Sequence, residues 1–148
     1  MAQSVTQFPK DPELQAIRLP PQSIEAEQSV LGGLLLDNAA WDKIADITSE
    51  SDFYRADHRA IFAAIIQLIE NNQPADALTV AETLDRNGKL NEIGGPAYLG
   101  TLALNTPSAA NIRRYAEIVR ERSVMRKLAS IGTEIAESAY NPMGKEAQ

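Results

Sequence analysis

Apolar residues recur along most of the chain at the spacing of one face of an α-helix. The first such segment starts after Pro20–Pro21, and the clearest one follows further along. The apolar positions of these two segments are Ile24, Leu31, Leu34 and Leu35, then Ile61, Phe62, Ile65, Ile66 and Ile69. No segment of useful length alternates between apolar and polar residues, which is the pattern of a half-buried strand. The pattern therefore predicts an all-α protein.

Residues that favour helix ends divide this pattern into separate helices. A side-chain oxygen before a helix can accept a hydrogen bond from its free amides, and proline suits its first turn. Such residues precede the apolar segments: Ser23, Asn38, Asp57, the capping-box pair Thr79 and Glu82, Pro96 and Ser108. Residues that end helices follow at Asn71–Asn72, at Asn87–Gly88 and at Asn105–Thr106–Pro107. We expect five helices followed by a much longer one.

The last predicted helix runs from Ala109 to about Tyr140. At about 1.5 Å per residue it would extend about 45 Å, which exceeds the width of a small helical head. Two apolar stripes follow it: Ile112, Tyr115, Ile118 and Val119, and then Val124, Leu128, Ile131, Ile135 and Ala139. Because the second stripe lies beyond the predicted head, we expect it to pack against another polypeptide segment.

The end of the chain indicates what that segment is. Asn141–Pro142–Met143–Gly144 is typical of a tight turn, and residues 145–148 have the composition of a new helix. The sequence therefore indicates a helical hairpin whose returning arm lies beyond residue 148. We divide the chain into a flexible tail at residues 1–20, a small globular helical head at residues 21–105, and the long helix with the start of the hairpin at residues 106–148. We expect the last region to serve oligomerisation.

Two adjacent glycines, Gly32 and Gly33, lie inside the first predicted helix. Each interior glycine costs about 1 kcal/mol of helix stability relative to alanine, so something outside the helix must compensate. We favour a neighbouring backbone that packs very close to this face. A contact with a ligand or a partner is the alternative.

Composition narrows the possible functions. The 148 residues are 44% hydrophobic, enough for a sizeable core, and carry a net charge of −6. This acidic balance argues against nucleic-acid binding driven by overall positive charge. The chain has no cysteine and one histidine, which excludes disulfides and thiolate or histidine-cluster metal sites and favours an intracellular compartment. No apolar run is long enough to predict a membrane span or a secretory signal.

Candidate catalytic chemistry is absent from the sequence. A phosphate-binding P-loop needs two glycines with four residues between them, and then Lys followed by Ser or Thr. Gly88–Lys89 and Gly144–Lys145 lack both the first glycine and the hydroxyl residue. His58 has no nucleophile or ligand at a recognisable spacing, so we interpret it as an ordinary residue in the first turn of a helix. The sequence predicts neither catalysis nor a bound cofactor in this chain.

One stretch of the long helix is rich in basic residues. Arg113, Arg114, Arg120 and Arg122, with Arg126 and Lys127 after them, alternate with Glu117 and Glu121. We favour a solvated helix face with ion pairs between neighbouring turns. A surface that contacts phosphates, in a helical nucleic-acid-binding module, remains the alternative, and an acidic patch on a protein partner is a third interpretation.

Several of these segments, in this order, resemble one known family. They are Pro20–Pro21 with Ile24–Glu25–Ala26–Glu27–Gln28–Ser29–Val30–Leu31–Gly32, Asp52–Phe53–Tyr54 with His58, Gly94–Gly95 with Tyr98–Leu99, and Thr106–Pro107–Ser108–Ala109–Ala110–Asn111–Ile112 with Tyr115–Ala116 and Ile118–Val119–Arg120–Glu121–Arg122. Together they are similar to the N-terminal domain of bacterial replicative helicases of the DnaB family, over about residues 18–148.

The resemblance implies a collar domain of a ring-shaped hexameric DNA helicase, in which N-terminal domains pair through helical hairpins into a trimer of dimers and dock the C-terminal domain of primase. It also implies a cytoplasmic protein that meets a helicase loader and contacts DNA only weakly or indirectly through this domain. ATP and magnesium would belong to a motor domain absent from this chain.

By position, the resemblance places Glu25, Tyr98, Tyr115 and Ile135 where the family contacts primase or a neighbouring subunit. We add Val124, Leu128 and Ile131 from the second stripe of the long helix as candidate interface residues. Because Tyr98, Tyr115 and Ile135 each lie on an apolar stripe, burial in the core is the competing interpretation.

Overall fold

The computed structural model describes residues 19–142, and every regular element in that range is helical. In chain order the elements are α3 (Ile24–Leu36), the 3₁₀ turn η1 (Asn38–Ala40), α4 (Trp41–Ile44), η2 (Glu50–Asp52), α5 (Ala56–Glu70), α6 (Ala77–Arg86), η3 (Asn91–Ile93), α7 (Gly95–Asn105) and α8 (Ile112–Tyr140). The predicted all-α class and the long final helix are confirmed. The predictions for residues 1–18 and 143–148 lie outside the described residues.

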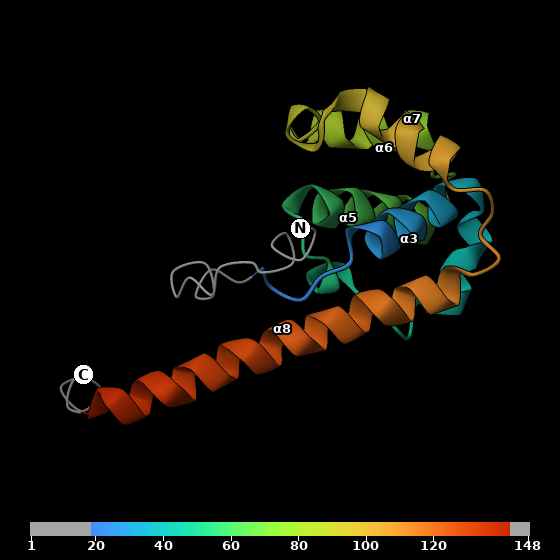
Figure 1. Ribbon diagram of the computed structural model, residues 1–148. Helices are drawn as coiled ribbons and strands as arrows, with labels where there is room; N and C mark the ends of the chain where they lie inside the picture. Colours follow the sequence, from blue (N-terminus) through green and yellow to red (C-terminus); the bar gives the residue numbers. More distant parts are fainter. Residues whose placement is uncertain (1–18, 143–148) are drawn as a thin grey trace, which may run out of the picture.

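The helix α3 lies at the centre of the head and contacts α5, α7 and α8. In Figure 1, α6 and α7 lie on one side of α3 and α5, and α8 crosses the other side and continues well past the head. None of the helices in residues 19–142 combines the length and the hydropathy that crossing a membrane requires.

A single apolar core fills the space between these helices. Val30, Leu31 and Leu34 of α3 are completely buried, as are Ile61 and Ile65 of α5. Aromatic rings close one side of the core, where Phe62 contacts Phe53 at 4.8 Å and Trp41 at 5.8 Å between ring centroids. The near end of α8 joins the same core through its buried residues Ile112, Ala116 and Val119.

The two glycines of α3 lie where other backbone segments approach most closely. A Cβ atom on Gly32 would lie 2.0 Å from Thr106 Oγ1 and 2.5 Å from the Leu102 carbonyl oxygen, at the end of α7. A Cβ atom on Gly33 would lie 3.0 Å from Cδ1 of Ile112, the first residue of α8. The predicted close crossing is confirmed, and it brings α7 and the start of α8 against α3.

Two of the predicted helix starts are confirmed. The Ser23 hydroxyl accepts a hydrogen bond from the Ala26 amide at 3.2 Å, which caps α3. Pro96 lies in the first turn of α7. The cap predicted at Asn38 is formed by the residue before it, Asp37, at the start of η1. The Asn38 side chain instead bonds the backbone of Leu34 and Ala75.

Three other predicted caps are wrong. Asp57 lies inside α5, which begins at Ala56, and its carboxylate pairs with Arg55 instead of capping. The capping box of α6 uses Asp76 and Thr79, one turn before the predicted Thr79 and Glu82, because Asp76 offers its carboxylate to the Thr79 amide at 2.9 Å. Ser108 bonds the Ala110 amide in a turn, and α8 begins only at Ile112.

The close crossing at Gly32 predicts that adding one methyl group there lowers the stability of the fold. We expect Gly32→Ala to lower the free energy of unfolding by about 3 kcal/mol, since overpacking against backbone outweighs the gain in helix propensity. Gly100→Ala on α7 is the matched control, because its Cβ would have no neighbour within 4 Å. We expect that change to stabilise the fold by up to about 1 kcal/mol. Urea unfolding of both variants measures the difference, and equal effects would contradict the close crossing.

Candidate functional site

The described residues hold no group of three His, Asp or Glu side chains arranged to bind a metal ion. The features that distinguish this chain are instead a buried polar network in the head and an exposed apolar stripe on α8. The first holds three helices together, and the second leaves apolar side chains in contact with water.

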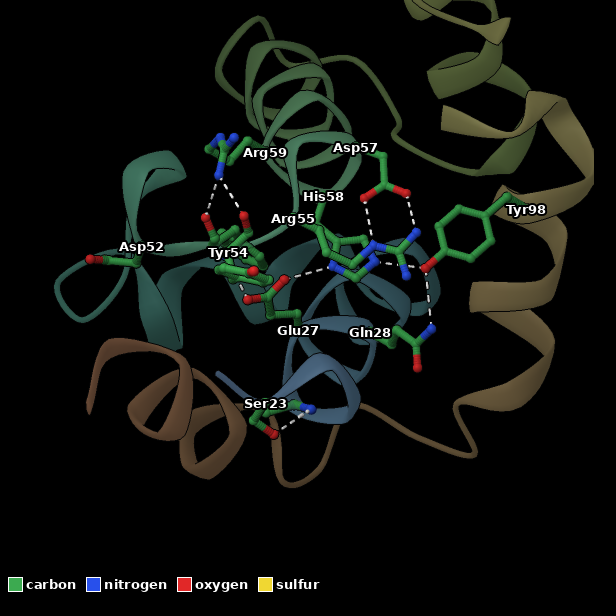
Figure 2. Close-up of polar contacts among 12 residues, drawn as sticks. Ser23, Glu27, Gln28, Asp52, Tyr54, Arg55, Asp57, His58, Arg59 and Tyr98 are labelled. Atoms are coloured by element: carbon green, nitrogen blue, oxygen red, sulfur yellow. Dashed lines mark hydrogen bonds and ion pairs between the residues drawn. The ribbon is translucent and has the colours of Figure 1, made fainter. Parts of the chain in front are cut away.

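The buried network joins α3, α5 and α7 through Glu27, His58 and Tyr98. The Nδ1 atom of His58 lies 2.7 Å from Oε1 of Glu27, and its Nε2 atom lies 2.6 Å from the Tyr98 hydroxyl. The His58 side chain is 0% exposed and that of Glu27 is 2% exposed. Figure 2 shows the imidazole held between the carboxylate and the phenol. Three helices therefore share one continuous set of polar contacts inside an otherwise apolar core.

Two further groups complete the network. The backbone amide of Tyr54 donates to Oε2 of Glu27 at 2.7 Å, and the side-chain amide of Gln28 donates to the Tyr98 hydroxyl at 3.2 Å. Both carboxylate oxygens and both imidazole nitrogens thus have partners, which burial of such groups requires. The rings of His58 and Tyr98 also lie nearly parallel, 5.9 Å apart.

His58 lies in the first turn of α5, as predicted, but its side chain is not an ordinary surface one, because it is buried and bonded on both sides. The sequence did contain a signal for this pairing. Glu27 lies on the same helix face as Leu31 and Leu34, and a carboxylate on a buried face requires a polar partner. Because His58 and Tyr98 lie far from Glu27 along the chain, the sequence pattern could not identify them as its partners.

A second ion pair lies beside the network at the start of α5. The guanidinium of Arg55 is bound by both oxygens of Asp57, and this hydrogen bonding raises the pKa of Arg55 above its ordinary value. The same guanidinium lies 5.8 Å from the centre of the Tyr98 ring, at cation–π distance. Arg55 and Asp57 therefore hold the outer face of Tyr98, as Figure 2 shows.

Arg126 fixes the direction in which α8 leaves the head. Its guanidinium donates to the Pro21 carbonyl at 2.7 Å and to the Asp52 carbonyl at 2.6 Å, and it lies 5.4 Å from the centre of the Tyr54 ring. Arg120, nearly two turns earlier, approaches the buried Asp52 carboxylate at 3.6 Å. These contacts join α8 to the segments before α3 and before α5.

Around this anchor and beyond it, the predicted second stripe of α8 faces solvent. Val124 is 48% exposed, Leu128 69%, Ile131 51% and Ile135 67%. Their spacing places them on one side of the helix, and Met125, 50% exposed, lies beside them. Monomeric proteins rarely expose a continuous apolar surface of this kind without a partner for it.

The other predicted interface residues lie on the head. Glu25 is exposed on α3, Tyr98 is half-buried on α7, and Tyr115 is half-buried on the first turn of α8. The Glu25 side chain lines a shallow cleft between α3 and α7 together with Gln28, which bonds Tyr98. Tyr98 does not line this cleft and is connected to it only through its hydrogen bond with Gln28. The helix α8, which carries the stripe, runs on the opposite side of α3 from α7 and continues past the head (Figure 1).

The basic residues of α8 are mostly engaged within the chain. Arg113 lies 4.0 Å from Asp46 and 3.9 Å from Glu117. Arg114 lies 3.4 Å from Glu117 and 3.5 Å from Glu121. With Arg120 near Asp52, these pairs give the arrangement expected of a solvated helix face. Arg122 is half-buried on the same helix.

Together these features define a small helical head from which one long helix with an apolar stripe projects. Residues 19–121 match the model of the DnaB-like helicase N terminal domain. The chain belongs to the family of DnaB-like helicase N-terminal domains. The predicted resemblance is thereby confirmed.

Similarity to individual proteins agrees with the family match. The chain is 48% identical over 128 residues, 86% of its length, to the replicative DNA helicase DnaB of Buchnera aphidicola, of which it covers 28%. The chain spans 28–32% of the length of the curated relatives that it matches.

Two solved structures share the fold. The N-terminal domain of the Mycobacterium tuberculosis DnaB helicase superimposes with a TM-score of 0.80 at 45% identity, with 82% of this chain and 85% of that chain covered. The corresponding domain of the Helicobacter pylori DnaB helicase, described with its interactions with primase, gives a TM-score of 0.67 at 25% identity over 78% of this chain and 89% of that chain.

The network predicts a strong energetic coupling between Glu27 and His58. We expect Glu27→Met and His58→Leu each to lower the free energy of unfolding by about 3 kcal/mol, because each leaves a buried polar partner unpaired. The double variant should lose at least about 2 kcal/mol less than the sum of the two, since no unpaired charge remains. Urea unfolding of the four proteins measures this coupling. Glu82→Met on the exposed face of α6 is the control, and additive losses would show that the two side chains do not interact.

Proposed function

We propose that this chain acts as the N-terminal collar of a replicative DNA helicase, where it joins copies of itself into a ring and docks primase. The observation that carries the proposal is the exposed apolar stripe from Val124 to Ile135 on a helix that projects past its own head. Exposed apolar surfaces of this kind mark places where another polypeptide packs against a protein.

The occupant that best fits the stripe is a helical hairpin from a second copy, packed against the completed hairpin of the first. The stripe is long and straight, which suits antiparallel helices joined by a short turn. Arg126 holds the emerging helix at a fixed angle to the head through bonds to two backbone carbonyls. Two heads would therefore lie at a defined distance across such a dimer, and three dimers would form a hexameric ring.

Self-association should depend on the stripe and on a completed hairpin. We expect the chain extended by about 30 residues, enough for a returning helix, to dimerise in sedimentation equilibrium experiments. Leu128→Glu combined with Ile135→Glu should make the extended chain monomeric, because charges would be buried in the apolar contact. The thermal unfolding of the head should change little, since both side chains are well exposed here.

The matched control places the same charges on the other side of the same helix half. Ser130→Glu combined with Thr133→Glu alters exposed residues that lie away from the stripe and should leave the dimer intact. A monomeric extended wild-type chain would contradict the proposed self-association, and so would equal losses in the two double variants.

Primase docking is supported by family membership and by the Helicobacter pylori domain, which was described with its interactions with primase. The exposed surface of α3 and α7 that contains Glu25 and Tyr98 is the candidate contact on the head. The buried network holds the Tyr98 side chain in place, so this side chain needs little ordering when a partner binds.

We expect the C-terminal domain of primase to bind the 148-residue chain weakly and to bind the extended chain more tightly. The reason is that a dimer presents two heads at a fixed spacing to one partner, which raises the effective concentration of the second contact. Calorimetric titration of the two chains at equal head concentration measures this change. No heat of binding with the extended chain would contradict the docking proposal, while leaving self-association untouched.

The rest of the helicase activity is assigned to other parts of a longer protein. The curated relatives are more than three times as long as the segment matched here, and this chain lacks a P-loop. We place ATP and magnesium binding, DNA unwinding and contact with a helicase loader within such an assembly in the bacterial cytoplasm. The collar would hold the subunits at fixed positions and bind primase, and the motor domain would hydrolyse ATP and unwind DNA.

A nucleic-acid-binding module that uses Arg113, Arg114, Arg120 and Arg122 ranks second. The pairing of the first three with carboxylates of the same chain reduces the positive charge available to phosphates. Such a module would bind single-stranded DNA with an affinity that falls steeply with salt and disappears when these arginines are neutralised.

A further inference from the structure

An open cleft, which we call the α4–α5 cleft, lies on the head between α4, η2 and α5. Its volume is about 450 Å³, which is typical of a binding cleft. The side chain of Phe62 is buried there, and Trp41 and Ile66 are half-buried. The rings of Trp41 and Phe62 meet edge to face at 70°, which holds the indole in place. The cleft therefore offers a preformed apolar surface that a side chain can enter.

The α5 wall of the cleft gives its length. The lining residues on this helix recur at the spacing of one helix face, and they are Phe62, Ala63, Ile66, Gln67 and Glu70. At about 1.5 Å per residue, this wall extends about 12 Å along α5. That length accommodates about two turns of a helix or about four residues of an extended chain. The cleft therefore suits a short polypeptide segment.

Two exposed carboxylates line the cleft, one from each wall. Glu50 lies in η2, and Glu70 is the last residue of α5. Within residues 19–142, neither side chain has an ion-pair or hydrogen-bond partner, and the residues that line the cleft include no lysine or arginine. The charge of both carboxylates is therefore uncompensated where a partner would bind.

Glu70 also lies at an unfavourable end of its helix. The C-terminal end of a helix carries a partial negative charge, so a carboxylate there is destabilising. The last turn of α5 holds no basic residue that would offset this repulsion. A cation from another molecule, bound beside Glu70, would compensate both the carboxylate and the helix end.

We propose that the α4–α5 cleft docks a short segment of a protein partner, in which an apolar side chain is flanked by lysine or arginine. The apolar side chain enters between Trp41 and Ile66, and the basic side chains pair with Glu50 and Glu70. Nucleic acid does not fit this cleft, because its phosphates would lie against the two carboxylates.

This docking is independent of the self-association and primase docking proposed above. The residues that line the α4–α5 cleft include none of the stripe on α8 and none of the candidate contacts on α3 and α7. Failure of either of those functions would leave the cleft and its charges unchanged.

A phage-displayed library of short random peptides, selected on the 148-residue chain, identifies what the cleft binds. The library is first depleted on Ala63→Leu, in which a larger side chain occupies the cleft, so that peptides that bind elsewhere are removed. If Ala63→Leu fails to fold in thermal unfolding, Ala45→Leu on the opposite wall, where Ala45 is exposed, replaces it. We expect the remaining peptides to share an apolar residue with lysine or arginine on both sides. A consensus without basic residues, or no enrichment, would overturn the proposal.

Binding can be measured through Trp41, because it is the only tryptophan in the chain. A selected peptide that lacks tryptophan should change the fluorescence of Trp41. We expect Glu50→Gln and Glu70→Gln each to weaken binding about threefold, and the double variant about tenfold, as for ion pairs near a surface. Glu82→Gln on α6 is the matched charge control and should have no effect. Equal affinity for the double variant and the wild-type chain would overturn the role of the carboxylates.

Stability separates a docking role of Glu70 from a structural one. We expect Glu70→Gln to raise the midpoint of thermal unfolding by about 1–3 °C while it weakens peptide binding, because the carboxylate opposes the charge of the helix end. A lower midpoint would show that Glu70 supports the head itself and would overturn its docking role.

Two further outcomes would assign the cleft to a different occupant and overturn the proposal. If arginine amide binds as tightly as the selected peptides, the cleft takes a small organic cation. If the fluorescence of Trp41 changes with the concentration of the chain alone, and this change disappears in Ala63→Leu, the occupant is a second copy of the chain.

Discussion

The absence of a side chain at Gly32 is the constraint on which the rest of the domain depends. Because no Cβ is present, the Leu102 carbonyl and the Thr106 hydroxyl can pack directly against α3. This contact sets the position of α7 and therefore places Tyr98 within reach of His58. The neighbouring Gly33 lets the Ile112 side chain pack against α3 as well, although less closely, at the point where α8 begins. Both candidate surfaces thus derive their geometry from two adjacent glycines.

The domain separates two kinds of contact onto two parts of the structure. The α3 and α7 surface is polar, is attached to a buried network and keeps its side chains in defined orientations. The far half of α8 is apolar, exposed and away from the head. The first arrangement suits selective recognition through a few directed bonds, and the second suits a broad contact in which hydrophobic burial provides the affinity.

The sequence predicted the helices well, because their apolar periodicity depends only on residues three or four positions apart. It predicted the long final helix and the tight crossing at the glycine pair for the same local reason. It was less successful with caps. Asp76 and Asp57 both precede apolar segments with a suitable carboxylate, and only the position of Arg55 beside Asp57 decides that Asp57 pairs instead of capping.

The buried network shows the limit of local reasoning most clearly. The position of Glu27 on an apolar helix face indicated that its carboxylate needs a polar partner. That partner, His58, lies 31 residues further along the chain, and Tyr98, which bonds His58, lies another 40 residues on. The apolar stripe that contains Tyr98 indicated that this side chain could be buried, but nothing in the spacing of His58 or Tyr98 showed that they bond each other. Their roles arise only when α3, α5 and α7 pack together, and identifying them required the tertiary structure.

The attachment of α8 by Arg126 also has a mechanical consequence. From Arg126 to Tyr140 the helix continues for about 21 Å at 1.5 Å per residue, so a tilt of about 5° at the guanidinium would displace its tip by about 2 Å. The part of α8 after Arg126 therefore acts as a lever that pivots where Arg126 bonds the main-chain oxygens of Pro21 and Asp52. Small shifts of the two loops that carry those carbonyls would therefore produce larger displacements of the C-terminal end of α8 and of any segment packed against it.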